Sequence, residues 1–167
     1  HYVGVDVMPT VCEKVRQLSE WYKSTMKVDI ILTPSEDLLK NKSFLKRYKN
    51  YFDVIIVCPP YWTMELYNEG QQSTERYKNY EEWLHKYWED TVKVCKHILH
   101  NEGHFMYIAN DYNDLQKQHY ELTKDFENIT IKYFSYVKNL NLCNRVSPLR
   151  VNKKQRIEKI YIFKNNL

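Results

Sequence analysis

The stretch FDVIIVCPPYW, residues 52–62, decides the fold. Five of its first six residues are apolar, a pattern typical of a strand that is covered on both faces. Two prolines end this strand, because proline has no backbone N–H to continue the hydrogen-bonded ladder. Phe52–Val57 is therefore the strongest strand prediction in the chain. Its carboxyl end leads directly into a short turn that consists of Cys58, Pro59, Pro60, Tyr61 and Trp62.

Upstream of this stretch, strand patterns alternate with helical ones. Tyr2–Val7 and Val28–Leu32 are short apolar runs that predict strands. Residues 11–23 between them repeat apolar side chains at helical spacing after Pro9 and Thr10, which predicts a helix. Residues 36–48 have a partly helical pattern.

Downstream, a polar loop at 63–79 precedes a long amphipathic helix at about 80–100 and a glycine-containing turn at 101–103. The remaining expected elements are a strand at 103–109, a short helix near 113–124, and two alternating strands at 129–137 and 158–163 that pair antiparallel.

This order predicts a single α/β domain over residues 1–167, with a mostly parallel sheet, helices on both faces and an antiparallel last strand. Only three glycines occur, so a glycine-rich phosphate loop is excluded. No apolar run approaches the roughly 20 residues of a membrane span. Without a secretory signal pattern, and with four scattered cysteines, an intracellular location in cytoplasm or nucleus is expected. His97 and His100 lack a third ligand, so no metal site is expected.

Acidic residues follow the first two predicted strands. In open α/β sheets, ligands bind outside the carboxyl ends of the strands. Asp6, which precedes Val7 and Met8, is placed to accept hydrogen bonds from ribose hydroxyls. Asp37 is placed to accept from an adenine amino group, and Glu36 is an equally placed rival. The alternatives are a solvated turn acid and a helix N-terminal acid favoured by the helix dipole.

The chain resembles the S-adenosylmethionine-dependent amino-methyltransferases of nucleic acids. That family has Asp, Asn or Ser, then Pro-Pro and an aromatic residue, directly after a strand reading Phe-Asp-hydrophobic; here the stretch reads FDVIIV-C-PPY. Residues 77–111 and 144–165 are similar to the family's following helix, turn, strand and final antiparallel strand, so the resemblance spans Tyr2 to Asn165. It implies a Rossmann-like methyltransferase fold and an S-adenosylmethionine site. That site comprises Asp6, Val7, Met8, Glu36, Asp37 and Cys58.

The resemblance also implies a catalytic role for the Pro-Pro turn. In the family, the first side chain of the motif and the first proline carbonyl accept the hydrogens of the target amino group, which here assigns Cys58 and Pro59. Pro60 holds that carbonyl rigid, and Tyr61 offers a ring for the extracted base. The predicted reaction is methylation of adenine N6 in DNA. Cytosine N4 poses the same chemical problem, and RNA or a protein glutamine are less favoured acceptors.

Two features depart from the family pattern. Cys58 stands where Asp, Asn or Ser is expected, and a neutral thiol is a weak acceptor. The family's first central strand and glycine-rich turn are not found, which would leave unpaired strand edges. Either upstream residues were lost from this sequence, or another chain or segment completes the sheet. No separate target-recognition domain is expected. The rival interpretation is a non-catalytic scaffold or nucleic-acid-binding subunit.

Nucleic acid, DNA in preference to RNA, is the expected partner. Residues 145–159 carry six basic side chains against one acid, which favours phosphate contacts, although a solvated loop is the alternative. Loop 63–79, with Tyr67, Arg76 and Tyr77, is expected to close over an extracted base or to be an ordinary loop. The predicted nucleic-acid contacts are Trp62, Arg76, Arg145, Arg150, Lys153, Lys154 and Arg156.

Overall fold

The structure is a computed structural model that describes residues 1–22, 25–65, 67, 69–143 and 157–166. The chain divides into two compact units, each of which is described by itself. Unit 1 comprises His1–Arg47 and Pro60–Val94, and unit 2 comprises Tyr48–Pro59 and Cys95–Leu167. The expectation of a single domain stays a prediction.

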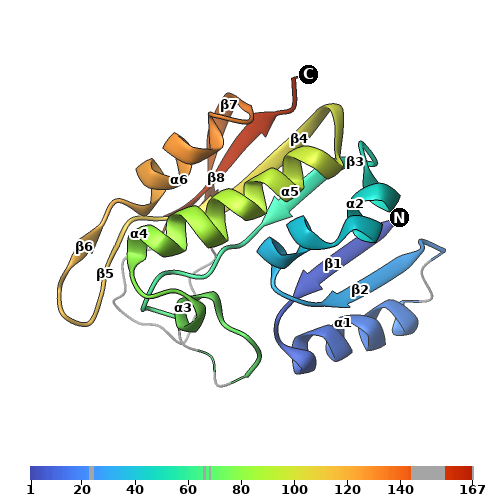
Figure 1. The fold of residues 1–167 in the computed structure, drawn as a ribbon, viewed down its shortest axis with the longest axis horizontal. Coiled ribbons are helices and arrows are strands. Elements are labelled where there is room, and N and C mark those ends of the chain that lie inside the picture. The colour runs from blue at the N-terminus through green and yellow to red at the C-terminus, as the bar shows by residue number, and fades with distance from the viewer. Residues whose placement is uncertain (23–24, 66, 68, 144–156, 167) are drawn as a thin grey trace. The chain divides into compact units, whose positions relative to one another are not determined.

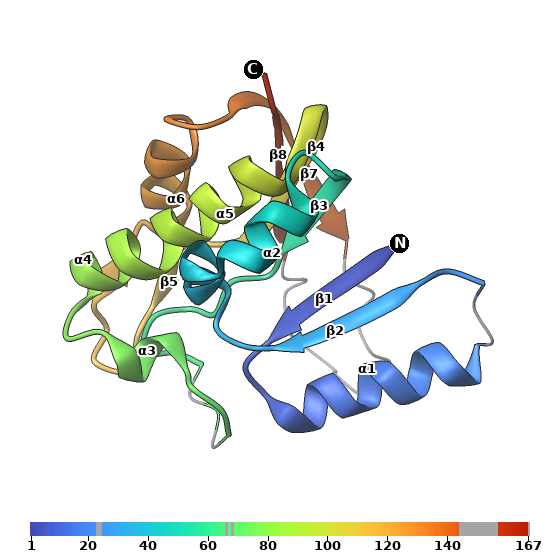
Figure 2. The same ribbon diagram turned by 45° about the vertical axis from the view of Figure 1, so that its right-hand side comes forward.

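Unit 1 begins with a parallel strand pair and its crossover helix. β1 (Tyr2–Asp6) and β2 (Val28–Leu32) pair in register, with Asp6 opposite Leu32. The helix α1 (Pro9–Trp21) connects the two strands and packs along them (Figures 1 and 2). Both strand predictions are confirmed, and the carboxyl ends of the two strands lie at the same edge.

The rest of unit 1 is helical, and its core is aromatic. A 3₁₀ helix, η1 (Ser35–Lys40), and the short helix α2 (Lys42–Tyr48) follow β2. The predicted long helix consists of α4 (Tyr80–Trp83), a π-helical segment η2 (Leu84–Glu89) and α5 (Asp90–Ile98). Trp83 and Trp88 have no exposed surface, and the Trp83 ring stacks on those of Tyr80 and Tyr87.

Unit 2 contains a mixed four-stranded sheet in the order β3-β4-β8-β7. β3 (Phe52–Val57) runs parallel to β4 (Leu99–Ala109), whereas β8 (Ile157–Lys164) is antiparallel to both β4 and β7 (Ser135–Cys143). The helix α6 (Leu122–Thr130) contributes to the same core. The predicted antiparallel pair near the end of the chain is confirmed. The fully buried aromatic side chains of this unit are Phe105, Tyr107, Phe126 and Phe163.

The helix predicted near residues 113–124 is wrong. This region forms a hairpin of β5 (Tyr112–Asn113) and β6 (His119–Tyr120), and α6 starts only at Leu122. Asp114 competes with helix formation because its Oδ1 accepts hydrogen bonds from the amides of Gln116 and Gln118, both at 2.9 Å. The rings of Tyr112 and Tyr120 stack across the hairpin.

The strand predicted at 129–137 begins later, at Ser135. Leu122, Phe126 and Ile129 are buried at helical spacing, and their burial extends α6 through Thr130. The Thr130 hydroxyl donates to the Phe126 carbonyl at 2.7 Å inside that last turn.

The predicted turn at 101–103 is a bulge inside β4. Phe52 is opposite Leu99 but Val54 is opposite His104, so extra residues of β4 loop out between the two pairs. Glu102 has a positive φ of 66°. A Cβ on Gly103 would lie 2.9 Å from the His100 oxygen and 3.0 Å from the Asp53 oxygen, so only glycine fits there.

Several strand edges lack a neighbour among the described residues, those of β1 and β3 among them. There β1 pairs with β2 alone, and β3 pairs with β4 alone. Val54 and Ile56 of β3 are 50% and 60% exposed, although their sequence is typical of a strand covered on both faces. The expectation that a further strand completes the sheet stays a prediction. Over the described ranges, no helix has the length and apolar character to cross a membrane.

Candidate active site

The end of β1 forms a tight turn around Asp6. The Asp6 carboxylate accepts a hydrogen bond from the Met8 amide at 2.8 Å, with Val7 between them. The Asp6 carbonyl accepts from the Thr33 amide at 3.0 Å, which ties the end of β1 to the residue that follows β2. Asp6 is therefore half-buried at the carboxyl edge of the strand pair, where a ribose acceptor was predicted.

Glu36 and Asp37 lie in the first turn of η1, directly after β2. The Asp37 amide donates to the Pro34 carbonyl at 3.2 Å, and the Ser35 hydroxyl is 2.8 Å from that of Thr91. Only 4% of the Glu36 side chain is exposed, against 32% for Asp37. The two neighbouring acids therefore differ strongly in their access to solvent.

Arg76, on α3 (Ser73–Arg76), pairs with both acids. Its Nη1 lies 2.7 Å from Glu36 Oε1, and its Nη2 lies 2.9 and 2.8 Å from the two oxygens of Asp37. The Tyr77 hydroxyl donates to the same Glu36 oxygen at 3.0 Å. Burial raises the pKa of Glu36, and burial together with the charge of Glu36 raises the pKa of Tyr77. Arg76 was predicted to contact nucleic acid; in the structure it neutralises two carboxylates.

The segment Glu69–Tyr77, hereafter the strap, also contacts the start of α1. Glu69 accepts from the Thr10 amide at 2.8 Å and from its hydroxyl at 2.5 Å. Gly70 has φ +77°, and a Cβ there would lie 2.0 Å from the Val7 carbonyl oxygen. Together with Arg76, these contacts attach the strap to the ends of both β1 and β2.

Sequence reasoning missed the strap's role. One signal was present: α1 has no side-chain cap at Met8 and no acid in its first turn, so its exposed N–H groups need an acceptor from elsewhere. Glu69 supplies that acceptor from 59 residues away. Nothing in the local sequence around Thr10 indicates which of the many distant acids would do so.

The Pro-Pro turn spans the division between the units. Cys58 is exposed and Pro59 is buried, both in unit 2, whereas Pro60 and Tyr61 belong to unit 1. The Tyr61 amide donates to Glu65 Oε2 at 3.3 Å. Tyr61 is the first residue of the turn that leads to Glu65, and its side chain is half-buried.

The residues that were predicted to contact nucleic acid or an extracted base lie in different environments. Trp62 is only 8% exposed and its ring lies 5.8 Å from that of Trp83, so it is part of the core of unit 1. Tyr67 lies near Glu65 and Asp6; burial raises its pKa, and these two acids add to the rise. Five predicted residues lie outside the described ranges: Arg145, Arg150, Lys153, Lys154 and Arg156.

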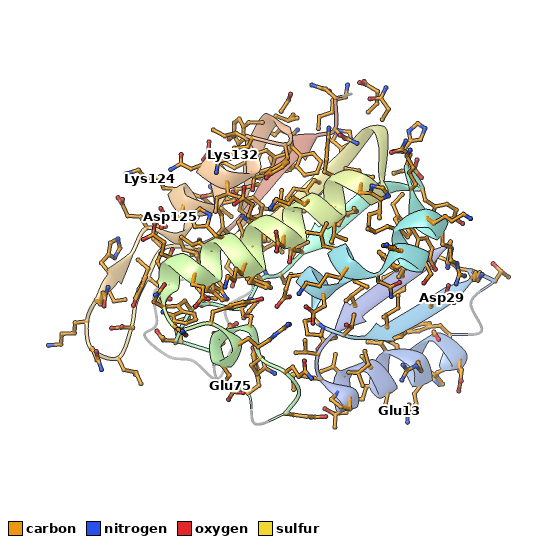
Figure 3. All side chains as sticks on the ribbon, in the orientation of Figure 1. Glu13, Asp29, Glu75, Lys124, Asp125 and Lys132 are labelled. Atoms are coloured by element: carbon orange, nitrogen blue, oxygen red, sulfur yellow. The ribbon has the colours of Figure 1, made fainter. Side chains whose placement is uncertain are left out.

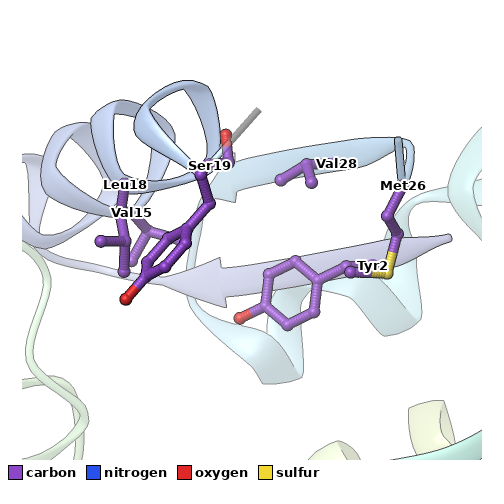
Figure 4. A pocket seen from close by; sticks show the side chains of 7 residues that line it. Tyr2, Val15, Leu18, Ser19, Met26 and Val28 are labelled. Atoms are coloured by element: carbon purple, nitrogen blue, oxygen red, sulfur yellow. The ribbon is translucent and has the colours of Figure 1, made fainter. Parts of the chain in front are cut away.

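An apolar pocket of about 260 Å³ lies between α1 and the strand pair (Figure 4). Tyr2 and Val28, the first residues of their strands, help to line it, together with Leu18 and Met26. Asp6 and Leu32 are at the opposite ends of the same strands. The pocket is therefore separate from the predicted cofactor site. Within the described part of the chain, no three His, Cys, Asp or Glu side chains are grouped to hold a metal ion.

Comparison with solved structures identifies the fold. A candidate DNA modification methylase from Thermus thermophilus superposes with a TM-score of 0.57 at 15% identity, over 80% of this chain and 52% of that chain. An N-methyltransferase, NodS, from Bradyrhizobium japonicum gives 0.55 at 13% identity, over 99% and 73%. A methyltransferase from Pyrococcus furiosus gives 0.57 at 16% identity, over 99% and 62%.

These similarities confirm the predicted Rossmann-like methyltransferase fold. The chain spans about half the length of the Thermus thermophilus protein. No protein-family model matches the sequence, and the search of curated proteins found no match.

Proposed function

We propose that this chain is an S-adenosylmethionine-dependent methyltransferase that acts on an exocyclic amino group of nucleic acid, adenine N6 of DNA in particular. The observation that carries the proposal is Asp6, at the carboxyl end of β1 in a methyltransferase fold. The Thermus thermophilus protein was crystallised with S-adenosylmethionine, and NodS with S-adenosylhomocysteine.

The residues at the strand ends fit this cofactor unequally. Asp6 is a half-buried carboxylate at the right edge to accept from ribose hydroxyls. Asp37 also follows β2, but both of its oxygens contact Arg76. The adenine end of the site therefore fits the cofactor only when Arg76 gives up part of this contact.

The cofactor supplies an electrophilic methyl group on a sulfonium ion. The task of the protein is then to make the amino nitrogen nucleophilic, because its lone pair is delocalised into the base. In the proposed site, the Pro59 carbonyl and the Cys58 sulfur accept the two amino hydrogens, which favours a tetrahedral nitrogen. Tyr61 stacks on the base and fixes its orientation.

Asp6→Ala tests the cofactor site. We expect it to weaken S-adenosylhomocysteine binding by about 1.5–3 kcal/mol, because charge-assisted hydrogen bonds are lost. Isothermal titration calorimetry on the full-length protein measures this directly, with Asp29→Ala at the other end of β2 as a matched control. Unchanged affinity in Asp6→Ala would show that the ribose is bound elsewhere.

Cys58 tests catalysis. Replacement by Asp or Asn provides a better acceptor next to Pro59, and a tenfold gain in methyl transfer needs only about 1.4 kcal/mol of transition-state stabilisation. Tyr61→Ala should lower activity by removing a stacking contact worth about 1–3 kcal/mol. The assay uses DNA and RNA oligonucleotides, and thermal unfolding checks that each variant is folded.

A non-catalytic scaffold or nucleic-acid-binding subunit is the second candidate. It is favoured by the cysteine at position 58, where the family has Asp, Asn or Ser, and by the contact between Arg76 and Asp37. If the parent, Cys58→Asp and Cys58→Asn are all inactive while still binding cofactor, the catalytic proposal is wrong and the scaffold is favoured.

The proposal includes a further strand, from another segment or another chain, that completes the sheet. Its support is that β1 and β3 each pair on one side within the described residues, and that Val54 and Ile56 are exposed. Unpaired parallel edges of this kind leave backbone N–H and C=O groups without ladder partners.

A further inference from the structure

Arg76 occupies the acceptor that the cofactor's adenine needs. This inference rests on the proposed function, which assigns Asp37 to the adenine amino group. Arg76 Nη2 contacts both oxygens of the Asp37 carboxylate, at 2.9 and 2.8 Å. An ionised carboxylate has about four lone-pair sites, and a single guanidinium nitrogen within reach of both oxygens takes the pair that faces away from the side chain, where an incoming donor would also approach. Arginine and an adenine amino group therefore compete for the same carboxylate.

The difference in burial between Glu36 and Asp37 determines which carboxylate Arg76 loses more easily. The Glu36 side chain is 4% exposed, and it accepts hydrogen bonds from Arg76 Nη1 at 2.7 Å and from the Tyr77 hydroxyl at 3.0 Å, besides one from its own backbone amide. Removing the cation from a buried carboxylate is costly, because the charge loses compensation that water cannot replace. Asp37 is 32% exposed, so water or a ligand can replace the guanidinium there. When a ligand competes, Arg76 therefore keeps its contact with Glu36 and loses its contact with Asp37.

The strap connects this exchange to the segment that follows Tyr61. Arg76 fixes the end of the strap to η1, while Glu69 and Gly70 fix its beginning to Thr10 and Val7. Losing the Asp37 contact removes two of the three hydrogen bonds that Arg76 makes to η1. The beginning of the strap keeps its own contacts, so the loosening is confined to the part around α3.

We propose that Arg76 is a latch: it holds the strap closed on Asp37, and adenine binding at Asp37 loosens the strap. Occupation of the cofactor site is thereby coupled to the mobility of the chain segment that follows Pro60 and Tyr61. Arg76 acts through Asp37 and does not touch the reacting atoms, so it is a positioning residue.

Arg76→Lys is the decisive variant. A lysine ammonium keeps the positive charge beside Glu36 but cannot span two carboxylates with a planar fork. We expect S-adenosylhomocysteine to bind about five- to tenfold more tightly to Arg76→Lys than to the parent, measured by isothermal titration calorimetry. In the Asp37→Asn background the same substitution should give no gain, because the contested carboxylate is gone.

Arg47→Lys is the matched control. Arg47 also pairs with a carboxylate in unit 1, with Nη2 3.0 Å from Asp29 Oδ2. Figure 3 labels Asp29 on β2 and Glu75, the neighbour of Arg76, on α3, at separate places in that unit. Cofactor affinity should not change in this control.

Hydrogen exchange on the parent protein gives a second measurement that does not depend on how a variant folds. Amides of residues 73–77 should exchange faster when S-adenosylhomocysteine is added, whereas those of Val7 and Met8 should be protected. Slower exchange across residues 73–77 would overturn the latch.

The outcomes separate the latch from the proposed function. Equal or weaker binding by Arg76→Lys, with the parent still binding, overturns the latch alone and makes Arg76 a group that organises Asp37. If neither protein binds S-adenosylhomocysteine, both the latch and the proposed cofactor site are wrong.

Discussion

The strand pair of unit 1 and the central strand β4 of unit 2 are both rich in apolar residues but are buried to different extents. In β4, Phe105, Tyr107 and Ala109 have no exposed surface. By contrast, no residue of β1 or β2 is fully buried, although VDIIL is as apolar as most buried strands. Burial is therefore set by what packs on a strand, and the predicted cofactor-binding acids lie on the less buried pair.

The contrast continues within unit 2 itself. β3 and β4 are parallel neighbours, yet Ile56 of β3 is 60% exposed while Phe105 of β4 is 0% exposed. β4 has a strand on each side, whereas β3 has one only on the β4 side within the described residues. Weakly packed elements open at low free-energy cost, and ligand-binding segments are commonly of this kind.

The largest expected effect is a difference in unfolding free energy between truncating an apolar side chain on β4 and truncating one on β2. Phe105→Ala removes a fully buried ring that stacks on Phe134 at 4.9 Å, and it should cost about 3–5 kcal/mol of unfolding free energy. Ile30→Ala on half-buried β2 should cost about 1–2 kcal/mol. Urea unfolding measures both, and similar losses at the two sites would contradict the comparison.

The buried side-chain amide of Asn165 contacts the bulge of β4. Asn165 has no exposed surface, and its Nδ2 donates to the carbonyls of Leu99 and His100 at 2.9 and 3.1 Å. Asn165→Ala leaves the buried Leu99 carbonyl and the part-buried His100 carbonyl without that donor, and we expect a loss of about 2–3 kcal/mol in urea unfolding. Asn139→Ala, at an exposed site on β7, is the matched control and should change stability by less than about 0.5 kcal/mol. A loss in the Asn165 variant no greater than in this control would show that the bulge is stabilised elsewhere.

Local patterns were sufficient for most of the fold. FDVIIV and the apolar runs of β1 and β2 predicted strands with the observed bounds to within a residue, because burial on a pleated surface leaves a clear signature. The hairpin at 112–120 was not predictable in this way. Its turn depends on one side chain, Asp114, that accepts from two amides, and its composition does not differ from that of a polar helix.

The candidate site was predictable in its positions but not in its partners. Asp6, Glu36 and Asp37 were located by their place after strands, which is a property of the parallel fold. The contacts of Arg76 with Glu36 and of Glu69 with Thr10 join residues 40 and 59 positions apart. A single sequence contains no signal that selects these partners, and the burial of Trp62 against Trp83 is missed for the same reason.

Glu69→Gln should have the smallest effect, and its pH dependence identifies the cause. Hydrogen bonds from Thr10 lower the pKa of Glu69 from its ordinary value of 4.5, so the charged carboxylate is favoured in the folded state. Its contribution to stability is therefore fully present above pH 4.5 and is lost as pH falls through the lowered folded value. Glutamine cannot change charge, so Glu69→Gln should be slightly less stable than the parent at about pH 7, and the gap should close toward about pH 3. Urea unfolding at a series of pH values measures the gap, with Glu20→Gln on the last turn of α1 as the control. A gap that does not depend on pH would mean that Glu69 stabilises the start of α1 by shape alone, and that the strap is not held there by charge.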